Sequence, residues 1–214
     1  MMGLLNSKNS LSIFSIWLVT ISGMIGIYLG YMDWFVSKTP MNLILGMILL
    51  FWNFPPKNGW RSILVWFVVY ILGMTVEAVG VNTGLLFGSY VYGENLGFKV
   101  IGVPILIGVN WVVLTFLTAT VSKRFISNKW LAIFCGAFLM VLLDVFIEPI
   151  APIFDFWSWE LGFAPIRNFV DWFIVSLIMQ VIVRNELPEE SASFPIHHLA
   201  SQFVFFIFFC LIFY

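Results

Sequence analysis

The sequence predicts an all-α protein, a polytopic transmembrane helix bundle of about seven spans with its N-terminus in the cytoplasm. Of its 214 residues, 61% are apolar and only 10% are charged, and the mean hydropathy is +1.01. A soluble domain of this length could not bury so much apolar surface. The bilayer must therefore act as its solvent, and residues 1–214 are expected to form a single integral membrane domain.

Seven apolar stretches approach the roughly 20 residues needed to cross about 30 Å of hydrocarbon. The first is long and lacks a small-residue cleavage site behind it, so we expect it to remain as a helix. The second and sixth are the shortest. The predicted spans are residues 11–31, 40–54, 62–81, 101–121, 130–150, 168–182 and 194–213.

Lysine and arginine in alternate connections predict the orientation of the chain. The N-terminal side carries seven of them, Lys8, Lys57, Arg61, Lys123, Arg124, Lys129 and Arg184, with the acids Glu186, Glu189 and Glu190. The other side carries only Lys38, Lys99 and Arg167. Because positive loops stay in the cytoplasm, the N-terminus is predicted to lie there, in a multi-pass protein of the cytoplasmic membrane.

Most of the carboxylates are expected at the opposite, outer face. These eight are Asp33, Glu77, Glu94, Asp144, Glu148, Asp155, Glu160 and Asp171. For loop acids such as Asp33 and Glu94, the positive-inside bias alone is as good an explanation as a functional role. It explains the acids that lie within helices much less well.

Depth in the membrane separates the helix acids from the loop acids. At about 1.5 Å per residue, Glu77 and Asp171 lie roughly 6 Å inside the outer ends of their spans, and Asp144 about 9 Å. Asn110 lies roughly 13 Å from the same face. Ionisable groups at such depth are costly and usually face the bundle interior, where they serve a pathway or a reaction. We therefore expect one outer-leaflet cavity lined by four helices.

Asp144 and Glu148 have the i, i+4 spacing that places two side chains on one helical stripe. Two carboxylates that are close in a low dielectric cannot both ionise cheaply, so one is expected to stay protonated near neutral pH. The alternative is that Arg167 neutralises the pair in a structural ion pair.

Two long connections rich in aromatic residues flank these acids, at residues 82–99 and 148–160. Pro149 and Pro152 prevent a regular helix in the second. Both connections are expected to be re-entrant or to lie across the mouth of the bundle. Their aromatic residues would line the entrance, although an aromatic belt at the membrane interface is the alternative. The residues in question are Tyr90, Tyr92, Phe154, Phe156, Trp157 and Trp159.

The supply of residues excludes several chemistries. Only two histidines are present, His197 and His198, so a histidine-rich di-iron site cannot form, and both are expected to be interfacial residues rather than ligands. No nucleotide, dinucleotide or elbow-serine motif occurs. What remains is carboxylic acid chemistry on a hydrophobic substrate, or proton-coupled transport.

Several segments between residues 77 and 172 resemble the carotenoid 1,2-hydratase family, which includes bisanhydrobacterioruberin hydratases. They are EAVGVNTGLLFGSYVY from Glu77, GVP from Gly102, IGVNW from Ile107, DVFIEP from Asp144, WSW from Trp157 and PIRN ending at Asn168. Asp171 occupies a position where a small residue is expected in much of the family. The resemblance implies that water is added to the terminal double bond of an acyclic carotenoid end group, of the lycopene or gamma-carotene type, by a hydro-lyase without a cofactor.

This chemistry predicts roles for the acidic and aromatic residues. Asp144 and Glu148 would share a proton, and one of them would protonate the alkene to give a tertiary cation. Glu77, Asn110 and Asn168 would hold and deprotonate the attacking water, and Asp155 could replace any of the carboxylates. Electron-rich rings would stabilise the cation and shape the substrate site: Tyr90, Tyr92, Trp111, Trp157, Trp159 and Trp172. We expect no metal and no nucleic-acid partner, only the lipophilic carotenoid and the bilayer.

Two other functions stay open at this point. A membrane carotenoid cyclase would make the same cation by the same protonation and then close a ring instead of capturing water. A proton-coupled transporter would also need carboxylates in its membrane helices. Against transport, the acids are expected at one face, and no inverted repeat is visible.

Overall fold

The computed structural model describes residues 2–56, 58–187 and 192–214, with side chains from residue 7 onward. It confirms the all-α bundle, because its described residues contain seven helices long and apolar enough to cross a membrane. Lys57, Glu189 and Glu190, three charged loop residues used for the orientation, lie outside the described residues.

The helices are α1 (Met2–Tyr28), α2 (Met32–Val36), α3 (Thr39–Asn53), α4 (Trp60–Thr83), α5 (Ile105–Phe125), α6 (Lys129–Ile147), α7 (Ile166–Val183), the 3-10 turn η1 (Arg184–Glu186) and α8 (Ser193–Phe213). Four short strands accompany them: β1 (Tyr90–Tyr92), β2 (Lys99–Val100), β3 (Val103–Pro104) and β4 (Trp157–Trp159).

The fourth span begins at Ile105 rather than at residue 101, so its predicted start was wrong. Strands β2 and β3 pair antiparallel just before it, and Ile101 and Gly102 form their turn with positive φ angles of 52° and 79°. The residues of this turn are apolar, so hydropathy alone extended the helix through them. The second span also differs, since the short helix α2 precedes α3.

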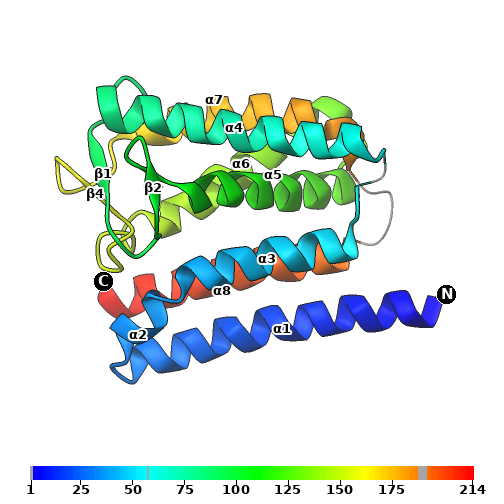
Figure 1. Cartoon of the computed structure of the whole chain (residues 1–214), viewed down its shortest axis with the longest axis horizontal. Coiled ribbons are helices and arrows are strands. Elements are labelled where there is room, and N and C mark those ends of the chain that lie inside the picture. The colour runs from blue at the N-terminus through cyan, green and yellow to red at the C-terminus, as the bar shows by residue number, and fades with distance from the viewer. Residues whose placement is uncertain (1, 57, 188–191) are drawn as a thin grey trace.

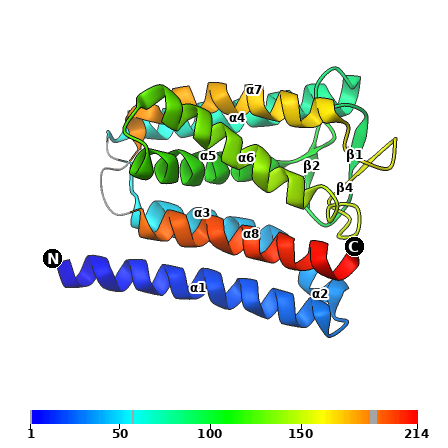
Figure 2. The same ribbon diagram turned by 180° about the vertical axis from the view of Figure 1, so that it is seen from behind.

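Helix α5 lies at the centre of the bundle and is buried along most of its length. Helices α4 and α7 lie on one side of it and α3, α8 and α1 on the other, with α1 at the edge, while α6 crosses it obliquely (Figure 1). The view from behind shows the same order (Figure 2). A helix that is apolar all round is suited to such a central position.

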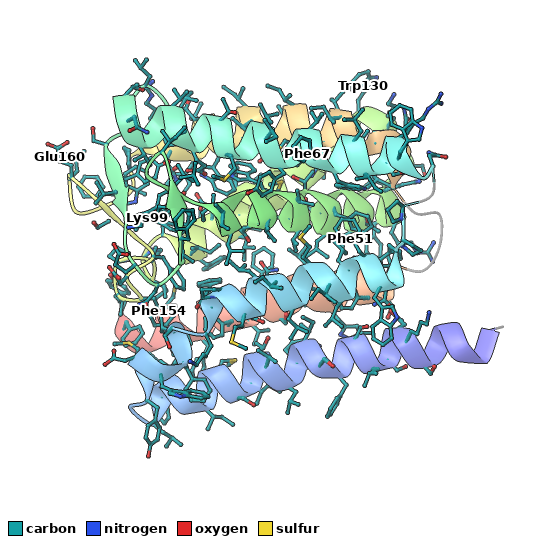
Figure 3. All side chains as sticks on the ribbon, in the orientation of Figure 1. Phe51, Phe67, Lys99, Trp130, Phe154 and Glu160 are labelled. Atoms are coloured by element: carbon teal, nitrogen blue, oxygen red, sulfur yellow. The ribbon has the colours of Figure 1, made fainter. Side chains whose placement is uncertain are left out.

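All four strands lie at one end of the bundle, which we call the strand end; the chain begins at the opposite end (Figure 1). There β1 pairs antiparallel with β4, with Tyr90 opposite Trp159 and Tyr92 opposite Trp157. Helix α6 ends at Ile147, and turns follow it through the two prolines, as predicted. Figure 3 shows Lys99, Phe154 and Glu160 at the strand end and Trp130 at the other. The two long connections therefore lie across the mouth of the bundle and hold each other there.

Candidate active site

The strand end contains a small chamber of about 30 Å³ beneath strands β1 and β4. Its walls come from helices α4, α5, α6 and α7 and from the two connections. Eleven of the twelve predicted site residues line it; Asp155 does not. The lining residues are Glu77, Phe87, Tyr90, Tyr92, Ile107, Asn110, Trp111, Asp144, Ile147, Glu148, Trp157, Trp159, Asn168 and Trp172.

Glu77 of α4 is held on one wall by three hydrogen-bond donors. The Tyr90 and Tyr92 hydroxyls both donate to its Oε2, the latter at 2.7 Å, and Trp111 Nε1 donates to Oε1 at 3.0 Å. The period of two in strand β1 is what turns both tyrosines to the same side. Burial and the nearby Glu77 charge raise the pKa of Tyr90 and of Tyr92, so both remain donors. A carboxylate with three such donors is stabilised in its ionised form.

Asp144 and Glu148 lie opposite, at the end of α6, and both are buried. The Nδ2 amide of Asn168 donates to Asp144 Oδ2 at 2.9 Å and to Glu148 Oε1 at 3.1 Å. Because one amide nitrogen carries two hydrogens, it can serve both carboxyls at once. Asn168 thereby fixes the two acids relative to each other.

The donors around the pair favour different protonation states for its two members. Glu148 Oε2 also accepts from Trp159 Nε1 at 2.6 Å and Trp157 Nε1 at 3.1 Å. Burial raises the pKa of Glu148 to about 7, while these two indole N–H groups act to lower it. Glu148 thus has three N–H donors and Asp144 has one. A single shared proton is therefore better placed on Asp144, with Glu148 ionised.

Aromatic rings cover the rest of the chamber. Trp111 and Trp172 stack with their ring centroids 4.0 Å apart and an interplanar angle of 19°. Tyr90 packs against Trp159 with centroids 5.0 Å apart, across the strand pair. The faces of such rings are electron-rich and attract a positive charge. The chamber therefore combines three buried carboxyl groups with aromatic walls that can stabilise a cation.

Asp155 and the other connection acids lie outside the chamber. The Asp155 carboxylate is exposed and accepts a hydrogen bond from the Glu94 backbone N–H at 2.8 Å, which joins the two connections. Glu94 itself forms an ion pair with Lys99 at 2.8 Å. Asp33 and Glu160 are exposed. Of the eight acids expected at this face, three converge.

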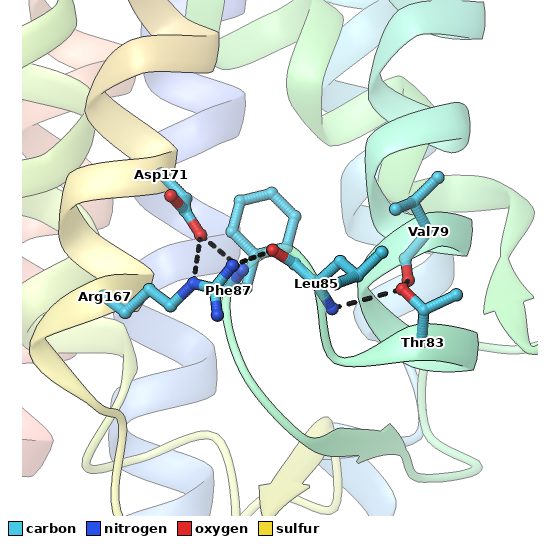
Figure 4. A network of polar contacts seen from close by, with 6 residues as sticks. All are labelled: Val79, Thr83, Leu85, Phe87, Arg167 and Asp171. Carbon is cyan, nitrogen blue, oxygen red and sulfur yellow. Dashed lines mark hydrogen bonds and ion pairs between the residues drawn. The ribbon is translucent and has the colours of Figure 1, made fainter.

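Arg167 does not neutralise the Asp144–Glu148 pair, so that alternative was wrong. Its guanidinium donates to Asp171 at 3.3 Å and to the Leu85 carbonyl (Figure 4). Asp171 also accepts from the Phe87 N–H at 2.8 Å, and Phe87 has a positive φ of 65°. Asp171 thus fastens the loop after α4 to α7. Among the described residues, no lysine or arginine forms an ion pair with Asp144 or Glu148.

A second cavity, which the sequence did not reveal, leads from the chamber into the bundle. It is an apolar groove of about 740 Å³ between α1, α2, α3, α5 and α8. Ile107, Asn110, Ile147 and Trp157 line both cavities, so the two adjoin. His198 also lines the groove; it is buried against α3 and not interfacial as expected.

The chamber also includes Phe87, Ile107 and Ile147, which the sequence prediction did not name. Ile147 could have been predicted to line the chamber, because it lies one turn from Asp144 on the same helix stripe. The side chain of Asn110 forms no hydrogen bond with any described residue, and it lies at the junction of chamber and groove.

Comparison with known proteins gives one result. A family described as carotenoid biosynthesis protein matches the chain over residues 38–214, which covers α3 to α8 and all the chamber residues. Neither the curated proteins nor the solved structures provide a match.

Proposed function

Because the chain belongs to the carotenoid biosynthesis protein family, we propose that it adds water to the terminal double bond of an acyclic carotenoid end group. The observation that carries this proposal is the buried Asp144–Glu148 pair, in a chamber that adjoins an apolar groove. A polyene dissolved in the bilayer would occupy the groove and bring its end to the junction at Asn110 and Trp157.

Asp144 protonates carbon 2 of the end group, and the alkene electron pair forms the new C–H bond. This leaves a tertiary cation on carbon 1. The ionised Glu77 and the faces of Trp157 and Trp159 stabilise the cation. Water attacks carbon 1 and loses a proton to Glu148, and a proton passing from Glu148 to Asp144 restores the pair. The product is a tertiary alcohol, and one water has been consumed.

Water capture is supported by the size and polarity of the chamber. A volume of about 30 Å³ has room for a water molecule. The Asn110 side chain and the Asn168 carbonyl oxygen are available to hold it, since Asn168 uses its Nδ2 on the two acids. A general base is most effective when its pKa lies near the working pH, and Glu148 meets this condition.

The alternative product is a ring. The same cation would cyclise onto a neighbouring double bond if no water were held beside it, so the aromatic walls alone are compatible with a cyclase. The amide groups and the room for water beside them favour hydration. A proton-coupled transporter would need a polar path to the other end of the bundle, and the three converging acids all lie at the strand end.

Expression in a host that accumulates lycopene or gamma-carotene tests the proposal. The expected pigment is more polar and heavier by one water, and it is absent with the Asp144→Asn variant. A new pigment of unchanged mass would establish cyclisation instead. Unchanged pigments with both hosts, in cells whose membranes contain the protein, would refute both reactions.

The positive-inside bias further supports a cytoplasmic N-terminus and an outer strand end in the cytoplasmic membrane. Glu160 and Ser127 are both exposed, and they lie at opposite ends of the bundle. A membrane-impermeant thiol reagent applied to intact cells should label the Glu160→Cys variant and not Ser127→Cys. The reverse pattern would invert the orientation.

A further inference from the structure

The groove has an inner end, away from the chamber, that none of the proposed chemistry uses. On α1 its lining runs from Ile27 near the strand end to Ile16, eleven residues and about 16 Å deeper. On α3 and α8 the deepest lining residues are Gly46 and His198. These two meet, because a Cβ atom on Gly46 would lie 2.8 Å from His198 Cε1. A larger residue at Gly46 would require the imidazole to shift.

This inner end is polar although it lies deep among apolar helices. His198 is 7% exposed, and its Nδ1 has no hydrogen-bond partner among the described residues. Gln202 follows one helical turn later and also lines the groove, and its amide forms no hydrogen bond with the described chain. Thr20 adds a hydroxyl from α1.

Such groups are costly where no water reaches them. A polar side chain inside a membrane protein usually finds a partner or marks a functional site. A neutral imidazole offers one donor and one acceptor, and a primary amide offers both as well. Either suits a hydroxyl or a carbonyl oxygen. The rest of the groove is apolar, with Phe205, Phe206 and Ile16 among its walls, so that oxygen must belong to an otherwise apolar molecule.

We propose that His198 and Gln202 form a subsite for an oxygen atom carried by an isoprenoid chain in the groove. The reacting end of the chain lies at the junction with the chamber, and the oxygen lies at the inner end. This inference rests on the proposed function, because the chain in the groove is taken to be that of the substrate. It implies that a reaction which introduces oxygen into the chain precedes the hydration.

Binding of two matched probes to the full-length protein in detergent tests the subsite. One is a linear polyene alcohol about 16 Å long, and the other is the hydrocarbon in which a methyl group replaces its CH2OH group. Trp34 and Trp157 line the groove, so a bound polyene quenches tryptophan fluorescence. One additional hydrogen bond should make the alcohol bind about five-fold more tightly.

The His198→Phe variant should lose this preference and still bind the hydrocarbon as the wild type does. Gln202→Leu should reduce the preference and provides the test if the first variant does not fold. Ser201→Ala is the matched control; the Ser201 hydroxyl already donates to the His198 carbonyl of its own helix, so the preference should persist. Equal binding of the two probes by the wild type, or an unchanged preference in both His198→Phe and Gln202→Leu, would overturn the subsite.

The same experiment separates the subsite from the reaction. A preference for the alcohol in a protein that hydrates no carotenoid would support the subsite and refute the proposed function. Hydration of a carotenoid by a protein that shows no preference for the alcohol would support the proposed function and refute the subsite.

Discussion

Asp144 and Glu148, one helical turn apart at the end of α6, share a single hydrogen-bond donor, the Nδ2 amide of Asn168. The shared donor prevents the two carboxyls from turning away from each other to relieve their repulsion. Two indole N–H groups then bind Glu148 alone. This asymmetry of donors favours the ionised form of Glu148 over that of Asp144.

The first prediction concerns these two acids. Asp144→Asn and Glu148→Gln should each lower hydration by about 10²-fold to 10⁴-fold, the usual contribution of a positioned acid or base. Product formation measured per amount of folded protein checks this. Glu160→Gln, an exposed carboxylate of the same connection, is the control and should leave the rate unchanged. Near-normal turnover in both chamber variants would remove the acid–base assignment.

The second prediction is a pH dependence. Burial raises the pKa of Glu148 to about 7, and the mechanism needs its ionised form as the base. Hydration should therefore fall as the pH drops through about 7. Trp159→Phe removes an N–H donor that lowers this pKa, so the acidic limb should move to higher pH. Initial rates of hydration in detergent between pH 5 and 9 measure the acidic limb of the wild type and its displacement in Trp159→Phe. An acidic limb that stays in place in Trp159→Phe would show that another group controls it.

The third prediction separates Asp171 from the chemistry. Asp171→Ala leaves the Phe87 N–H without its acceptor and removes one of the two acceptors of Arg167, which should lower the free energy of unfolding by about 1.5 to 3 kcal/mol. Thermal unfolding in detergent measures this loss. Turnover by the protein that remains folded should stay within a few-fold of the wild type. Abolished turnover at unchanged stability would instead give Asp171 a chemical role.

The fourth prediction concerns the close approach of α4 to α5. A Cβ atom on Gly73 would lie 2.7 Å from Trp111 Cδ1, so Gly73→Ala should displace the indole from both Glu77 and Trp172. We expect a loss of about 1 to 3 kcal/mol in stability and a weaker near-ultraviolet circular dichroism signal from the stacked tryptophans. Gly23→Ala, whose Cβ would make only an ordinary 3.4 Å contact, is the control. Equal effects of the two substitutions would contradict this account.

Hydropathy was enough to predict seven spans, because each helix must be apolar over about 20 residues whatever its neighbours are. It failed at Ile101, where apolar residues form a turn between two strands. The depth of Glu77 and Asp144 likewise predicted a shared chamber. The groove could not be predicted, since α1, α3 and α8 each have the composition of a lipid-facing helix and only their packing leaves a cavity. The partner of Arg167 could have been predicted, because Arg167 and Asp171 have the i, i+4 spacing of neighbours on one helix.

The pairing of Tyr90 with Trp159 has a consequence for biosynthesis. A ribosome releases β1 long before β4, and α5 and α6 must be inserted between them. Contacts between such distant parts of a chain form late in folding. A nascent protein truncated before Trp157 therefore possesses five helices long enough to span a membrane but neither indole donor for Glu148, so its chamber is incomplete until synthesis has passed that point.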